Sequence, residues 1–225
     1  MAESYELVLH NRSAQPDLAF ILYAATAVET GIGAFVPRGR YPIVWQEQGV
    51  NDGTTVHFDW TASYALMCAG QPCRAGDLWQ PGATWQVRQP GSAYLLDYTN
   101  GAYRFTDATP SGDLPPTAVD LCTSARVPAF DADLGPSVAL AISTGRRPAL
   151  LPVTAADSGP NLAHRFSLPP VYRIWAGQGE PGAMADLGTV SRHQEVQFTR
   201  ATSTDPWHAE WTLDPSNQWR PGPPA

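Results

Sequence analysis

The sequence contains no lysine, and only 16% of its 225 residues are charged. The absence of lysine excludes Schiff-base chemistry, a lysine general base and the nucleotide-binding loop whose lysine contacts phosphate. Arginine supplies all 14 strong cations against 21 acidic residues, which gives a net charge of −7, and Arg146-Arg147 is the only adjacent basic pair. Because a nucleic-acid interface needs clustered cations, we expect no nucleic-acid partner.

Long apolar segments are also absent. The longest candidate, residues 18–32, is interrupted by threonines and a glutamate, so we expect no membrane span. No basic stretch followed by an apolar run marks a secretory signal at the N-terminus, so we expect a cytoplasmic protein. Cys68, Cys73 and Cys122 form no C-x-x-C pair. We expect reduced thiols, with a Cys68–Cys73 disulfide as the alternative.

Recognisable catalytic and ligand-binding motifs are missing. The five histidines show no metal-ligand spacing, and we expect His57 and His164 to point outward from strands. Asp131-Ala132-Asp133 lacks the further ligands of a calcium loop, and Gly31-Ile32-Gly33 lacks the third glycine of a dinucleotide fingerprint. A lone cysteine such as Cys122 is more often a small buried residue than a nucleophile. The sequence therefore predicts no catalytic residue, no cofactor and no metal.

The strongest positive signal is the alternation of residue types with period two, which is typical of β-strands. Residues 5–9 and 54–60 alternate in this way, and 19 glycines and 22 prolines punctuate the chain. Asn100-Gly101 between two alternating segments is typical of a hairpin turn. We predict an all-β fold, an antiparallel β-sandwich of two packed sheets with many short strands and little helix. Residues 1–219 form this single domain, with a long surface loop at 107–116 and a flexible proline-rich tail at 220–225.

Several blocks of residues carry a family resemblance, and they follow one another in the same order over most of the chain. They are Val56-His57-Phe58-Asp59-Trp60-Thr61, Tyr64-Ala65-Leu66-Met67, Trp79-Gln80-Pro81-Gly82-Ala83-Thr84, Gly159-Pro160-Asn161-Leu162, residues 169–177 and residues 213–219. Together they resemble the rhizosphere-induced RhiA-type proteins of bacteria. The resemblance implies a cytoplasmic or cell-associated β protein, and it assigns no functional residues.

Aromatic residues are abundant, with 8 tryptophans and 8 tyrosines. One interpretation places most of the tryptophans between packed sheets, as for Trp45, Trp60, Trp85, Trp175 and Trp211. The other is an exposed platform for a ligand or partner. Trp79, Trp207 and Trp219 stand beside prolines or turn residues and are the candidates for exposure. With their polar neighbours Asp77 and His208, they are the predicted contact residues.

These observations favour a non-enzymatic binding or interaction protein that could self-associate as a homo-oligomer. The alternative is a carbohydrate or small-molecule binding module with an exposed aromatic platform. Two less favoured hypotheses are a membrane-active β protein and an enzyme whose site is assembled from distant strands.

Overall fold

The computed structural model describes residues 3–15, 17–31, 40–109, 114–130, 135–143, 150–185 and 193–224. Arg146-Arg147, Asp131-Ala132-Asp133, Ile32-Gly33 and the centre of the predicted 107–116 loop lie outside these residues. The described residues form strands and no helix, which confirms the predicted all-β sandwich. None of these ranges contains a helix that is long and apolar enough to cross a bilayer.

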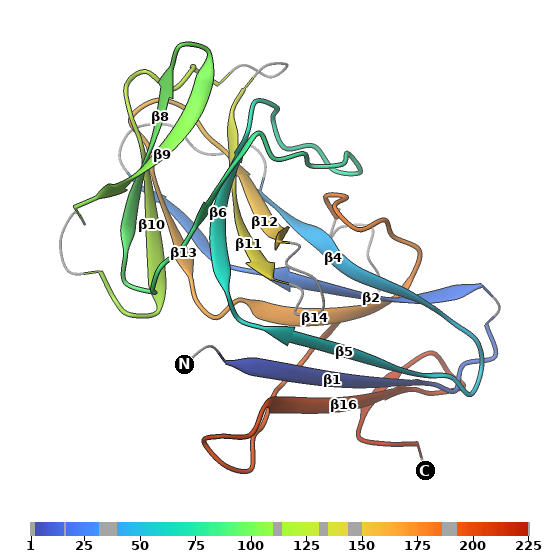
Figure 1. Ribbon diagram of the computed structural model, residues 1–225. Helices are drawn as coiled ribbons and strands as arrows, with labels where there is room; N and C mark the ends of the chain where they lie inside the picture. Colours follow the sequence, from blue (N-terminus) through green and yellow to red (C-terminus); the bar gives the residue numbers. More distant parts are fainter. Residues whose placement is uncertain are drawn as a thin grey trace.

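The strands of the described residues form three sheets, one more than the two predicted (Figure 1). The four-stranded sheet has the order β17 (Trp219–Pro221), β16 (Trp207–Leu213), β1 (Ser4–Asn11), β5 (Thr55–Thr61). The five-stranded sheet has the order β3 (Val28–Gly31), β13 (Ala163–Ser167), β10 (Ala118–Thr123), β8 (Ala93–Thr99), β9 (Ala102–Ala108). The eight-stranded sheet has the order β15 (Gln194–Glu195), β14 (Val171–Gly177), β2 (Leu18–Ala25), β4 (Arg40–Val50), β12 (Leu150–Asp157), β11 (Ser137–Ser143), β6 (Tyr64–Ala69), β7 (Ala83–Gln86). The paired strands are antiparallel, except for the parallel pairs β1–β16 and β8–β10.

The eight-stranded sheet is shared by two sandwich halves. In Figure 1 the four-stranded sheet lies beside β14 and β2, and the five-stranded sheet lies beside β6, β11 and β12. In the half that contains the four-stranded sheet, the Trp60 indole N–H of β5 donates a hydrogen bond of 3.1 Å to the Tyr172 hydroxyl of β14. One cluster of buried side chains contains residues from all three sheets, so both halves share a core.

The alternation in the sequence explains both the strands and their turns. Val56, Phe58 and Trp60 of β5 are buried, whereas the residues between them are more exposed. The predicted hairpin is confirmed, since Asn100 and Gly101 have φ values of 54° and 78° and connect β8 to β9. Two successive positive φ values are the geometry of a type I′ turn, which Asn-Gly adopts readily.

The tryptophans largely follow the prediction that they fill the interior. Trp45 and Trp60 are buried in the shared core, and Trp85 and Trp211 are half-buried against it. Trp175 is the exception. Because strand residues alternate between faces, Trp175 lies on the face of β14 opposite to its buried neighbour Ile174.

A second buried cluster lies between the eight-stranded sheet and the loop between β6 and β7. It includes Cys73, Trp79 and Met184, whereas Cys68 belongs to the shared core. Cys68 and Cys73 therefore contact different clusters, and both are free thiols. The alternative of a Cys68–Cys73 disulfide is wrong for this structure, because the chain places the two side chains in separate layers.

The C-terminal segment pairs further than expected. Trp211 to Leu213 of β16 pair with β17, and the Gly222 amide donates to the Glu210 carbonyl at 2.8 Å. The Thr212 hydroxyl also donates to the Gly222 carbonyl at 2.8 Å. The sequence predicts a flexible tail from residue 220, but these hydrogen bonds attach the chain to the sheet as far as Gly222.

Candidate functional site

The outer face of the four-stranded sheet gathers side chains that are far apart in the sequence. The inner residues of β1 and β5, such as Leu7 and Phe58, are buried in the core. Neighbours along a strand point to opposite faces, so the residues between them lie on the outer side of the sheet, where Val8 and Thr212 are nevertheless only 6% exposed. We call this outer surface the imidazole–carboxylate face, and it consists of Glu6, Val8, His10, Thr55, His57, Asp59, His208, Glu210 and Thr212.

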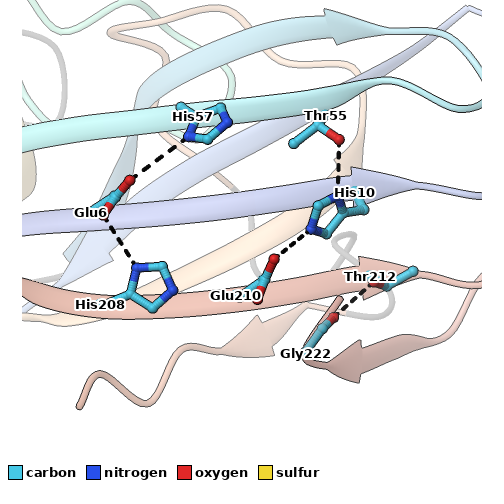
Figure 2. A network of polar contacts seen from close by, with 8 residues as sticks. All are labelled: Glu6, His10, Thr55, His57, His208, Glu210, Thr212 and Gly222. Atoms are coloured by element: carbon cyan, nitrogen blue, oxygen red, sulfur yellow. Dashed lines mark hydrogen bonds and ion pairs between the residues drawn. The ribbon is translucent and has the colours of Figure 1, made fainter. Parts of the chain in front are cut away.

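Two sets of contacts hold the polar side chains of the face (Figure 2). Glu6 lies between two imidazoles, with Oε1 at 3.9 Å from His57 Nδ1 and Oε2 at 3.3 Å from His208 Nδ1. His10 lies between Thr55 and Glu210, with Nδ1 at 2.9 Å from Thr55 Oγ1 and Nε2 at 2.8 Å from Glu210 Oε1. The side chains are therefore positioned by one another.

Part of the face is open to solvent, and the face carries both carboxylates and imidazoles. The side chains of His57 and His208 are 53% and 44% exposed. Their imidazoles can donate or accept hydrogen bonds when neutral, and they become cations when protonated. Throughout the described ranges, no three histidine, cysteine or acidic side chains are arranged to hold a metal ion. The arrangement suits recognition by hydrogen bonds and ion pairs.

A pocket of about 300 Å³ adjoins the face at the N-terminal end of β1. Glu6 and Asp59, which are directly opposite each other on β1 and β5, contribute carboxylates to its lining. Its remaining lining residues are Ser4, Tyr5, Trp60, Thr61 and Pro206. The pocket has room for a small polar group at the edge of the face.

The five contact residues predicted from the sequence are divided between two parts of the fold. His208 belongs to the imidazole–carboxylate face. Trp207 and Trp219 are half-buried against the core, and the Arg200 guanidinium lies 4.4 Å from the centre of the Trp207 ring. Asp77 lies instead in the loop between β6 and β7, where it lines a separate pocket with Arg74.

The predicted exposure of Trp79 is wrong. Its side chain is only 3% exposed, and its indole N–H donates to Ser137 Oγ at 2.8 Å. The loop folds back onto the eight-stranded sheet, so the prolines and glycines near Trp79 do not bring it to the surface. An aromatic platform that combines Trp79 with Trp207 is therefore not formed.

Sequence reasoning missed most of the face because it treated the histidines as scattered. His57 does point outward, as predicted. The prediction for His164 is wrong, since His164 is fully buried in β13 and shares the parity of buried Phe166. A signal was available in the alternation along β1. His10 and Glu6 stand next to the buried positions of this strand, so both side chains belong to its outer face.

Two groups elsewhere resemble catalytic elements but are poorly suited to catalysis. Ser158 Oγ lies 2.8 Å from His164 Nε2, yet both residues are fully buried. A nucleophile needs access to its substrate, which complete burial denies. Burial, followed by the nearby Asp120 carboxylate, raises the pKa of the Cys122 thiol, which disfavours the reactive thiolate.

Comparison with known protein families places the chain in one of them. A family model described as RhiA matches residues 2–220. The chain belongs to the RhiA family. This confirms the resemblance found in the sequence, and the matched range contains every residue of the imidazole–carboxylate face of this RhiA-family chain. No curated protein and no solved structure matches the chain.

Proposed function

We propose that this RhiA-family chain is a non-enzymatic interaction protein and that the imidazole–carboxylate face is its interaction surface. The observation that carries the proposal is the arrangement of Glu6 between His57 and His208, beside His10 between Thr55 and Glu210. Side chains that are ordered before association lose less conformational entropy on binding. The face is therefore prepared for a polar partner.

The inner side of the same sheet supports this assignment. Tyr5 and Trp60 stack with ring centres 5.3 Å apart and an interplanar angle of 2°, directly beneath the face. This aromatic layer supports β1 and β5, so the polar side chains stand on a packed base. A functional site placed on strands is held more precisely than one placed on loops.

The proposal accounts for the aromatic content without an exposed platform. An aromatic cluster fills the space between the sheets. Its rings contact one another, and they belong to Tyr5, Trp45, Trp60, Tyr172 and Phe198. The carbohydrate-module alternative used Trp79 or Trp207 as its platform, and Trp207 is half-buried against the core. Since Trp79 is buried, the geometry favours the polar face over an aromatic cleft.

The test is a binding screen that compares two double variants. Purified protein is titrated with panels of basic, acidic and neutral peptides, glycans and metabolites, and binding is located by the amide NMR signals of β1, β5 and β16. We expect at least one ligand class to shift these signals and to lose affinity for the His57→Ala/His208→Ala variant. The matched control is Arg104→Ala/Thr106→Ala on β9, which should bind as the unchanged protein does.

Two results would contradict the proposal. One is a panel in which no ligand shifts the signals of these three strands. The other is a ligand that binds the His57→Ala/His208→Ala variant and the β9 control equally well, because such binding would not use the face.

A further inference from the structure

The charge pattern of the imidazole–carboxylate face is complementary to the same pattern on a second copy of the chain. Strand register arranges the face in three rows that run across β5, β1 and β16. Each row takes one residue from β5, one from β1 and one from β16, in that order. The first row is Asp59, Glu6 and His208; the second is His57, Val8 and Glu210; the third is Thr55, His10 and Thr212. In the first two rows, a carboxylate on one outer strand corresponds to an imidazole on the other.

A two-fold axis parallel to β1 would bring these complementary groups together. Such a rotation places β5 of one copy over β16 of a second copy, with the two β1 strands facing each other. Asp59 then faces His208 of the second copy, and His57 faces Glu210 of the second copy. Val8 and Thr212 are buried, and the Thr212 hydroxyl already donates to the Gly222 carbonyl, so the outer residues of the first two rows supply the contacts. Symmetry produces each pair of contacts twice.

The charge complementarity between the two copies depends on the protonation state of the imidazoles. With neutral histidines, the Glu6 and Glu210 carboxylates give each face an excess of negative charge, and Glu6 and His10 each face their own copies across the axis. The nearby arginines lie at the rim: Arg12 follows β1 beside Gly53, and Arg220 on β17 is bound to Asp214 with Nε–Oδ2 at 3.1 Å. Protonation of His57 and His208 would place a cation opposite a carboxylate in both outer contacts, and like charges would then face each other only on the axis, at Glu6 and at a protonated His10.

We propose that two copies of this chain associate through their imidazole–carboxylate faces at mildly acidic pH, related by a two-fold axis parallel to β1. The proposal rests on the proposed function and specifies the partner of the same face. A second copy fits because the face supplies both members of every ion pair. At higher pH, the like charges of the two faces and the chain's net charge of −7 oppose association.

The size of the face sets the strength of the dimer. Three strands that are about 4.8 Å apart, with rows about 6.7 Å apart, cover on the order of 300 Å². Stable interfaces bury about 800 Å² on each partner. The dimer is therefore weak and reversible, and its population depends on protein concentration.

Sedimentation equilibrium at several concentrations, at about pH 5.5 and about pH 7.5, tests the association because histidine changes charge in this range. We expect the average mass to rise from monomer toward dimer at the lower pH and to remain that of a monomer at the higher pH. His57→Glu and Glu210→Arg should each weaken association at least about 10-fold at the lower pH, since each places like charges opposite one another. Thr106→Glu on β9 is the charge control and should associate normally.

Mixing the two variants tests the direction of the axis. His57→Glu and Glu210→Arg copies should form a mixed dimer, because the introduced carboxylate of one copy would face the introduced guanidinium of the other, and the natural pair would remain in the second contact. Circular dichroism confirms that each variant is folded. A wild-type monomer at both pH values, association that the face variants do not weaken, or a mixture that does not recover association would each overturn the proposal. The ligand screen above stays informative in all three cases, because it detects any other partner of the face.

Discussion

The outer faces of the four-stranded and five-stranded sheets both carry carboxylates, but they pair these groups with different cations. On the five-stranded sheet, Arg165 of β13 binds Asp120 of β10 through two nitrogen–oxygen contacts of 2.8 Å. On the four-stranded sheet, the corresponding partners of Glu6 and Glu210 are imidazoles. Arginine keeps its charge at every physiological pH, whereas histidine does not. One face therefore pairs its carboxylates with permanent cations, and the other pairs them with imidazoles.

This difference separates polar contacts that hold the fold together from those that we propose bind a partner. The Asp120 side chain is only 6% exposed, so its charge needs a permanent partner within the fold. At the end of β8, Asp97 is bound by Arg126, which lowers its pKa, and Ser124 adds a further hydrogen bond. Glu6 and Glu210 of the imidazole–carboxylate face are more accessible and have weaker partners. They are therefore the carboxylates that we propose contact another molecule.

The largest effect should come from the inner side of β5, opposite the imidazole–carboxylate face. Trp60 is buried and contacts Tyr5, Trp45, Tyr172 and Phe198. Trp60→Ala should lower the free energy of unfolding by about 3–5 kcal/mol, because it opens a cavity in this cluster. Urea denaturation followed by circular dichroism measures the loss.

The matched control is His57→Ala on the outer side of the same strand. It should change the free energy of unfolding by less than about 1 kcal/mol, because exposed ion pairs contribute little. Comparable losses in the two variants would show that the outer face is structural, and the contrast between the two sides of β5 would then be wrong.

An intermediate effect is expected on the five-stranded sheet. Asp120→Asn removes the charge that both nitrogen contacts of Arg165 use, and it should cost about 2 kcal/mol of unfolding free energy. The cost is limited because the Arg165 side chain is 35% exposed and water can replace part of the contact. Asp107→Asn is the control, since Asp107 and its partner Arg88 are 57% and 73% exposed. It should change stability by less than about 0.5 kcal/mol, and a larger loss than for Asp120→Asn would reverse the assignment.

The fold was largely predictable because its signals are local. Alternation in β5 identifies the buried side of the strand, and Asn100-Gly101 specifies a turn between neighbouring strands. The imidazole–carboxylate face was not predictable in the same way. His10 contacts Glu210, which is 200 residues away, because β1 and β16 pair in parallel. Residue parity indicates which face a side chain occupies, but it does not indicate which strands become neighbours.

The wrong predictions for His164 and Trp79 have different physical causes. His164 shares its parity with Phe166, so the strand pattern itself directs the imidazole inward, where Ser158 Oγ provides a polar partner. Trp79 lies in a loop of turn-type composition, which is typical of a surface segment. That loop covers one face of the eight-stranded sheet, and this layer arises only from the tertiary arrangement.

The smallest effect concerns acid stability at Asp97, and it tests whether the arginine pairs are the permanent contacts. Arg126 lowers the pKa of Asp97 in the folded protein, so this carboxylate stabilises the fold above its unfolded pKa of about 3.9. The stabilisation is lost as the pH falls through the lower, folded pKa. The stability difference between wild type and Asp97→Asn should therefore be constant above about pH 5 and should shrink below about pH 4. Urea midpoints along this pH series measure the difference. The stability difference between wild type and Arg126→Gln should shrink over the same pH range. A difference that is unchanged down to about pH 3 would mean that the Asp97–Arg126 contact contributes nothing to folding, and the five-stranded face would then lack one of its two permanent pairs.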